Sequence, residues 1–450
     1  MNKSKIIAGL ERICSTSKKS QKKPEEFESY SWWNKEGISV LLSGEEYKEF
    51  QKIINIIFSS VEIKNNFQRK DIENSLKELI SRILKNKSED VRKKKIKKEV
   101  NNFVKGLQGD INDWIFLIPI ENLYLDKHSI NVGNIVFQRM TKNKITKLQE
   151  KNKKIILSVK NLGEKAKKDF ADNEKKRMEN FFLGKTCARV ESSGTFSTAK
   201  YIAMQKTNAI LSILKLFTGS SETYSSKKYF GIEGEIISIK NRMIYGFRKD
   251  WQNATPSYEK VGYLFDFDLS KERRKIMNSN GFRKIMNIYN KNEWNDLDER
   301  IFNAVYWFSK AYDIPIVKKD KIEGRGQLES NQFNFSDKFL KLMIVLESLL
   351  IFGRESKTRN IKNRGSYLLE GDPTKRASIK KQLGYLYELR SDIVHEGSIK
   401  LSIKDIKLLN LYAQSIIISL IKNKAKWKLN TKRDLYIWFE KQRLDEEKLR

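Results

Sequence analysis

Apolar residues recur every three or four positions along the last third of the chain, and this spacing constrains the fold more than any other feature. The segment "DERIFNAVYWFSKAYD" places its apolar side chains at Ile301, Ala304, Val305, Phe308 and Tyr312. On an α-helix these positions form a single stripe that must be buried. The pattern returns in "SDKFLKLMIVLESLLIFG", with a helix cap at Ser336 or Asp337, and in "SIKDIKLLNLYAQSIIISLIKNK". The sequence therefore predicts a helical bundle over residues 295–425.

The middle of the chain has a different pattern. The segment "DWIFLIPIENLYLDKHSINVGNIVFQRM" contains two apolar runs separated by turn residues, which predicts strands and places His128 in a loop between them. The segment "TCARVESSGTFSTAKYIAMQKTNAILSILKLFTG" predicts a strand leading into a helix that starts near Ser197 and ends at Gly219. The predicted fold class is therefore mainly α, with an α+β middle region.

These patterns divide the chain into five predicted regions. Residues 1–30 are rich in lysine and serine, which is typical of a mobile basic N-terminal arm. A basic helical region over 31–140 ends in a β hairpin, and the α+β region covers 141–290. The helical bundle at 295–425 follows, and residues 426–450 form a charged C-terminal helix or tail.

The net charge indicates the kind of partner. The chain has 89 Lys plus Arg against 56 Asp plus Glu, a formal charge of +33. A polyanion would neutralise part of this surplus, so nucleic acid is the first candidate and an anionic membrane the second. The lysines of "SEDVRKKKIKKEVNNFV" are a candidate RNA contact, although such a run is more often the solvated face of a helix. They are Lys93, Lys94, Lys95, Lys97 and Lys98.

Composition also argues against several classes of protein. Cys14 and Cys187 are too few for a disulfide framework or a zinc site. No Gly-rich phosphate loop of the Walker type is present. The apolar run "SIIISLI" is far shorter than the ~18 residues of a membrane-spanning helix. We therefore expect a cytoplasmic protein without cofactor, metal or membrane partner.

One short segment, "ELRSDIVHEG", contains a candidate catalytic pair. His395 is one of two histidines in the chain, and it follows Arg390 by five positions. Five helical residues rotate a side chain by about 140°, so the pair would not share one face of a straight helix. Gly397 predicts a helix that already ends near His395, which would let the arginine swing towards the imidazole.

The chemistry of this pair suits RNA cleavage. An imidazole can accept a proton near neutral pH, and a guanidinium can hold a phosphate through two parallel hydrogen bonds. A structural role is the alternative: a helix-terminal histidine is stabilised by the helix dipole. Arg390 would then pair with Glu388, Asp392 or Glu396.

The surrounding segments carry a resemblance to a known family. The order "FLKLMIVLESLLIFG", "NRGSYLLEG" and "LGYLYELRSDIVHEG" resembles the Apea-like branch of the HEPN superfamily, over residues 295–425. In many members glycine directly follows the motif histidine, whereas Glu396 stands there in this chain. The resemblance implies an HEPN-like bundle in which Arg390 and His395 are catalytic and Ser391, Asp392 and Glu347 support them.

The resemblance also implies a function. It points to a metal-independent endoribonuclease that cleaves RNA by 2′-hydroxyl attack, in abortive infection or anti-phage defence or as a toxin restrained by an antitoxin. Such nucleases pair two bundles, so a homodimer through the bundle is expected. Two alternatives remain open: an RNA-guided CRISPR-type HEPN ribonuclease that binds a guide RNA, and a non-catalytic adaptor that binds RNA or protein.

Overall fold

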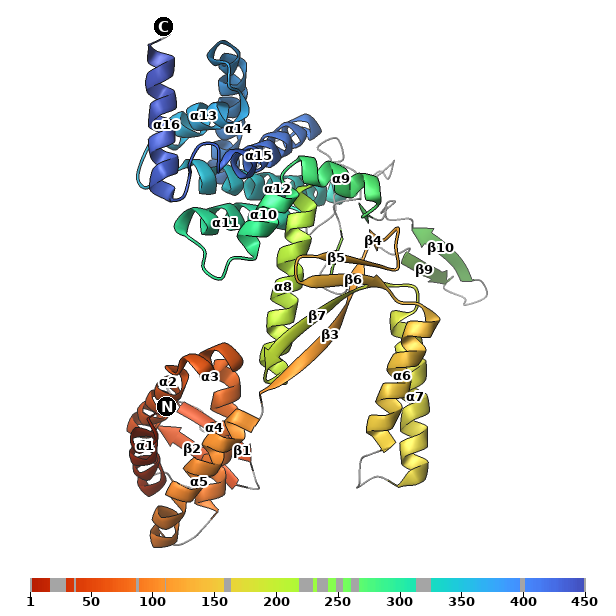
Figure 1. The fold of residues 1–450 in the computed structure, drawn as a ribbon, viewed down its shortest axis with the longest axis vertical. Coiled ribbons are helices and arrows are strands. Elements are labelled where there is room, and N and C mark those ends of the chain that lie inside the picture. The colour runs from red at the N-terminus through yellow and green to blue at the C-terminus, as the bar shows by residue number, and fades with distance from the viewer. Residues whose placement is uncertain are drawn as a thin grey trace. The chain divides into compact units, whose positions relative to one another are not determined.

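The fold was analysed in a computed structural model, which divides into two compact units (Figure 1). The structure describes residues 2–16, 30–35, 38–85, 89–109, 111–157, 163–217, 230–232, 242–247, 254–259, 267–312, 325–396 and 401–448. The N-terminal unit comprises Met1–Phe116 with Val190–Gln205, and the C-terminal unit comprises Leu117–Arg189 with Lys206–Arg450.

The N-terminal unit is mostly helical. Its elements are α1 (Lys3–Thr16), β1 (Tyr30–Lys35), β2 (Ile38–Ser43), α2 (Gly44–Phe58), α3 (Val61–Asn66), α4 (Arg69–Leu84) and α5 (Glu89–Gly109). One hydrophobic core joins α1, α2, α4 and α5, with Phe50, Leu76 and Val100 fully buried. Each of these helices buries one apolar stripe and leaves its charged face to solvent.

Two predictions for this part of the chain are wrong. Residues 3–16 are not a mobile arm, because α1 is helical and Ile6, Leu10 and Ile13 are fully buried in the core. The rest of the predicted arm, residues 17–29, lies outside the described residues. The predicted helical region also begins with strands, because β1 and β2 pair antiparallel.

A five-stranded sheet forms in the middle of the chain, in the order β5-β6-β7-β3-β8. Its strands are β3 (Asn112–Glu121), β5 (Ser129–Val132), β6 (Ile135–Arg139), β7 (Thr186–Gly194) and β8 (Gly231–Ile232). The β5–β6, β6–β7 and β3–β8 pairs are antiparallel. The short β4 (Leu123–Tyr124) pairs in parallel with β11 (Phe267–Asp268), and β9 (Arg242–Phe247) pairs with β10 (Ala254–Glu259). His128 lies between β4 and β5, which confirms the predicted loop position.

Several helices accompany the sheet. Two of them, α6 (Lys142–Leu157) and α7 (Glu164–Phe182), lie side by side as a helical hairpin (Figure 1). The predicted strand-then-helix segment is confirmed as β7 followed by α8 (Phe196–Leu216). Two short helices, α9 (Lys271–Ser279) and α10 (Phe282–Tyr289), follow β11.

The last third forms the predicted group of packed helices. Its elements are α11 (Asp296–Lys310), α12 (Arg325–Leu350), α13 (Lys357–Leu369), η3 (Pro373–Lys375), α14 (Arg376–Glu396), α15 (Ile403–Asn423) and α16 (Lys432–Glu447). The stripe of α11 is buried as predicted, from Ile301 to Tyr312.

The predicted cap at Ser336 or Asp337 is wrong, since α12 begins at Arg325. Of the two forms predicted for the C-terminal segment, helix or tail, the structure has the helix: α16 packs on α11 and α13 and buries Leu435 and Phe439.

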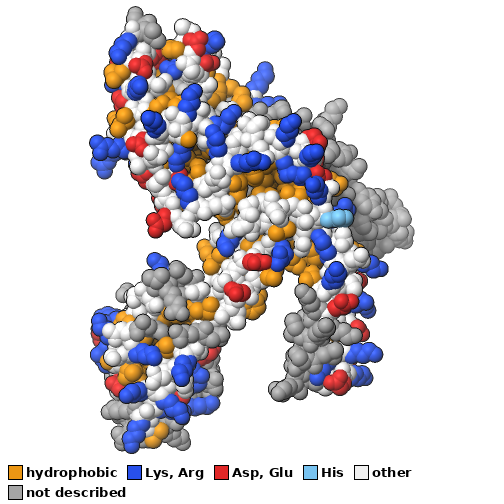
Figure 2. All heavy atoms as spheres, viewed as in Figure 1, with side chains coloured by type: hydrophobic (Ala, Val, Ile, Leu, Met, Phe, Trp, Pro, Cys, Tyr) orange, Lys and Arg blue, Asp and Glu red, His pale blue; other side chains and the backbone are white. Residues whose placement is uncertain are grey.

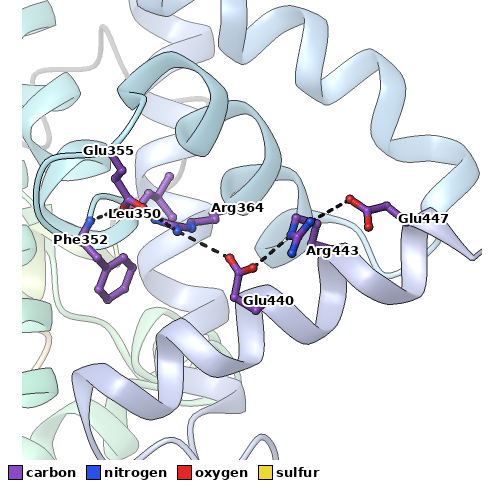
Figure 3. Close-up of polar contacts among 7 residues, drawn as sticks. All are labelled: Leu350, Phe352, Glu355, Arg364, Glu440, Arg443 and Glu447. Carbon is purple, nitrogen blue, oxygen red and sulfur yellow. Dashed lines mark hydrogen bonds and ion pairs between the residues drawn. The ribbon is translucent and has the colours of Figure 1, made fainter.

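A buried arginine connects three parts of this bundle (Figure 3). Arg364 on α13 is 4% exposed, and it donates to the Leu350 carbonyl at 2.7 Å and from Nη2 to Glu355 Oε2 at 3.0 Å. Its guanidinium also lies 4.0 Å from Glu440 on α16. Because a charge this deeply buried needs partners, the residues around it hold the end of α12, the following loop and α16 together.

The same contacts stabilise the ionised form of the Glu355 carboxyl. Burial disfavours the carboxylate, but hydrogen bonds from Arg364 and from the Phe352 N–H keep the pKa of Glu355 below its usual range. Arg300 approaches the same cluster, and burial together with the charge of Arg364 lowers the pKa of the Arg300 guanidinium to about 10.

Among the described residues, no helix is long and apolar enough to cross a membrane.

Candidate active site on α14

Helix α14 carries the candidate catalytic pair and is positioned by its apolar side. Leu383, Leu386 and Ile393 are buried where α14 packs against α12, α13 and α15. Leu389 on the same helix is only partly buried. The helix ends at Glu396, close to His395 as predicted, but His395 still has helical backbone, so the expected departure from helical geometry at His395 is wrong. Gly397 itself lies outside the described residues.

Arg390 is held by a carboxylate from another helix. Its Nε lies 3.3 Å from Oε1 of Glu347 on α12, and the two side chains are 24% and 20% exposed. Glu347 Oε1 is buried and has no hydrogen bond, so the contact is an ion pair without good hydrogen-bond geometry. The structure thus brings together two of the predicted site residues. The local partners considered for Arg390, such as Glu388 and Asp392, are not the ones it uses.

Tyr387 completes this part of the site and was not among the predicted residues. Its ring centroid lies 5.9 Å from the Arg390 guanidinium carbon. Burial and the nearby charge of Glu347 raise the pKa of the Tyr387 hydroxyl, while Arg390 opposes them. Residues three apart on a helix are neighbours, so the spacing to Arg390 was the available signal.

His395 is exposed and lies in the last turn of α14. Among the described residues its side chain has no hydrogen bond and no ion pair. Ser391 and Asp392 are part-exposed, and within the described chain their side chains also make no hydrogen bond. Because α14 stays helical, Arg390 and His395 point about 140° apart around its axis. One chain therefore does not bring the two groups together.

The lysine run lies in the N-terminal unit, on α5. Lys94, Lys97 and Lys98 are exposed and Lys95 is part-exposed, beside the fully buried Val100. The side chain of Lys93 is not among those described. The run is thus a solvated helix face, as an ordinary amphipathic helix would have. Figure 2 likewise shows Lys and Arg side chains spread widely over the drawn surface instead of gathered in one stripe.

Neither possible metal ligands nor known proteins indicate what this site does. In the ranges that the structure describes, no group of three or more His, Cys, Asp or Glu side chains could hold a metal ion. Comparison of the chain with protein-family models, with curated proteins and with solved structures gives no match. The chemistry of the site therefore has to be argued from its own residues.

Proposed function

We propose that this protein is an HEPN-class endoribonuclease that cleaves RNA without a metal ion. The observation that carries the proposal is on α14, where the exposed imidazole of His395 has no partner among the described residues and follows an arginine whose Nε is oriented by Glu347. A free imidazole can act as a base, and an oriented guanidinium can bind a phosphate. The resemblance of residues 295–425 to the Apea-like HEPN branch supports the same assignment.

The geometry of Arg390 suits phosphate binding. Its ion pair with Glu347 uses Nε, so the edge formed by Nη1 and Nη2 has no partner among the described residues. That edge can donate two parallel hydrogen bonds to phosphate oxygens. Glu347 would then act as a positioning residue that fixes the direction of the guanidinium.

The proposed reaction is a transesterification. His395 removes the proton of a ribose 2′-hydroxyl, and the resulting oxygen attacks the adjacent phosphorus. The bond to the 5′-oxygen breaks, and that oxygen takes a proton from a second acid. Arg390 stabilises the negative charge that develops on the phosphate oxygens.

A homodimer would supply what one chain lacks. Arg390 and His395 diverge around α14, and a single imidazole is poorly placed to serve both the attacking and the leaving oxygen. Two bundles related by a two-fold axis would bring a second His395 and a second Arg390 to one cleft. We therefore propose that the active unit is a dimer formed through the bundle at residues 295–425.

One observation favours a second candidate function. Arg390 is already engaged by Glu347, as in a structural ion pair, which would suit a non-catalytic adaptor that binds RNA or protein.

The RNA-guided alternative rests on the charge of +33, which could hold a guide RNA. The proposed cellular setting is defence against phage or a toxin restrained by an antitoxin, in the cytoplasm.

The products of cleavage test the proposal directly. Purified protein incubated with RNA in EDTA should produce fragments that end in a 2′,3′-cyclic phosphate or its opened form, because the nucleophile is the neighbouring 2′-hydroxyl. Sequencing of the RNA ends and mass spectrometry of the fragments measure this outcome. Fragments with 3′-hydroxyl ends, or cleavage that needs added magnesium, would contradict the mechanism.

Mixing two kinds of chain tests the dimer. We mix wild-type chains with an equal amount of His395→Ala chains and let the subunits exchange. If one active site needs both copies, the mixture should show about one quarter of the activity of the same total amount of wild-type protein. If each chain acts alone, the mixture should show about half of that activity. The control is the same mixture made without exchange of subunits, and activity that follows dilution in both mixtures would rule out a shared site.

A further inference from the structure

A pocket lies at the junction of the sheet with α9 and α10, within the C-terminal unit. It has a volume of about 380 Å³, which lies within the usual range of ~300–1,000 Å³ for small-molecule sites. We call it the α9–α10 pocket. Its apolar lining comes from the β5–β6 hairpin, α8, the residue after β11, α9 and α10, and comprises Val132, Leu214, Leu269, Met277, Phe282 and Met286.

Four asparagines line the same pocket: Asn131, Asn278, Asn287 and Asn290. Among the described residues, none of these four side chains has a hydrogen-bond partner. Asn278 differs from the other three because its Oδ1 is buried and accepts no hydrogen bond from the described residues. A buried amide oxygen without a donor destabilises the fold, and a ligand that supplies the donor removes that cost.

Two arginines border the pocket, and they differ in whether the guanidinium already has a partner. Arg274 is occupied, since it donates to Asp126 at 2.9 Å and to the Leu269 carbonyl. Arg283 is exposed and has no ion pair within the part of the chain described here. The pocket thus combines an apolar lining, unused amide groups and one available guanidinium.

The β5–β6 turn, which forms one wall of the pocket, contains a glycine in a left-handed conformation. Gly133 has a φ of +60°, and a Cβ at this position would lie 2.6 Å from Met286 Cε. Asn290 Oδ1 would lie 3.8 Å from the same Cβ. Glycine adopts this left-handed conformation without strain, and its missing side chain lets Met286 on α10 approach the β5–β6 turn closely.

We propose that the α9–α10 pocket binds an adenine nucleotide. A purine ring would pack on the apolar lining, and an asparagine amide can pair with the amino group and ring nitrogen of adenine through two hydrogen bonds. The phosphate would bind Arg283. The same chemistry is presented by a free nucleotide and by one nucleotide of single-stranded RNA. The proposal does not depend on cleavage at α14.

Titration calorimetry on the full chain tests this site with AMP, adenosine, GMP and a short 2′-O-methyl oligoadenylate, which resists 2′-hydroxyl attack. Asn278→Leu should weaken AMP and adenosine alike, by about tenfold for a lost hydrogen bond. Its melting temperature without ligand should stay the same or rise, because the substitution removes an unsatisfied buried oxygen. Arg283→Gln should weaken AMP by a similar factor and leave adenosine unchanged.

The control is Arg433→Gln, which removes an exposed arginine of α16 outside the pocket and should change neither affinity. Saturation by AMP identifies a free nucleotide as the ligand, and binding of the oligoadenylate alone identifies RNA; both support the site. Failure of both to bind would overturn the proposal, as would binding that is unaffected by Asn278→Leu and Arg283→Gln. GMP binding as tight as AMP would overturn the adenine assignment.

Discussion

His395→Ala should reduce RNA cleavage by roughly 10²- to 10⁴-fold, the usual contribution of a general acid or base. The imidazole is exposed, has no partner among the described residues and lies away from the buried side of α14. Exposed substitutions of this kind change the free energy of unfolding by about 0.5 kcal/mol or less. The loss should therefore appear in the rate of cleavage and leave the melting temperature unchanged.

His128→Ala is the matched control for this variant, since it removes the only other histidine of the chain. His128 is also exposed, and the hydrogen bonds that it accepts from Lys144 and from the Arg139 N–H use its backbone carbonyl, which the substitution keeps. Cleavage by His128→Ala should match the wild type. If His395→Ala cleaves RNA at the wild-type rate, or unfolds, the catalytic assignment fails and the adaptor function is favoured.

Arg364→Met should cost about 3–5 kcal/mol in the free energy of unfolding, the usual effect of removing one partner of a buried ion pair. The substitution removes the arginine that donates to the Glu355 carboxylate and to the Leu350 carbonyl, inside a cluster of rings from Phe352, Tyr436 and Phe439. Since small domains are stable by ~5–15 kcal/mol, this loss is large. Urea denaturation followed by circular dichroism measures it.

Two further variants show whether the loss comes from the buried charge. Arg364→Met combined with Glu355→Met should recover part of the stability, because both members of the pair are then apolar. Arg443→Met removes an arginine of the same network whose side chain is 38% exposed and pairs with Glu440 and Glu447 (Figure 3), and it should cost far less. Equal losses for Arg364→Met and Arg443→Met would show that Arg364 contributes no more than a surface ion pair.

The helices of the last third could be predicted because their stabilisation is local in sequence. The stripe from Ile301 to Tyr312 can be buried only if that segment is helical, and the structure buries it. The same rule applies at the N-terminus, where Ile6, Leu10 and Ile13 have helical spacing within a lysine- and serine-rich segment. Composition suggested a mobile arm, but burial of those three side chains in the core outweighs the charge around them.

At the candidate site, the local sequence did not predict which residue Arg390 pairs with. Neighbouring residues suggested local acids as partners of Arg390, yet the structure pairs it with Glu347, 43 positions earlier in the chain. The packing of α14 against α12 selects that partner, and nothing in the local sequence specifies it. In the same way, the α9–α10 pocket collects asparagines from β5, α9, α10 and the residue after α10, and no short motif marks them.

The sequence by itself determined the helical character of the last third and the strands on either side of His128, because periodic burial and turn residues act over short distances. It also determined that His395 and Arg390 share one helix. Only the tertiary structure decided that α14 continues past His395, so that the pair diverges around its axis, and that Glu347 orients Arg390. The physical reason is that partners of buried charges are chosen by packing between elements far apart in the chain.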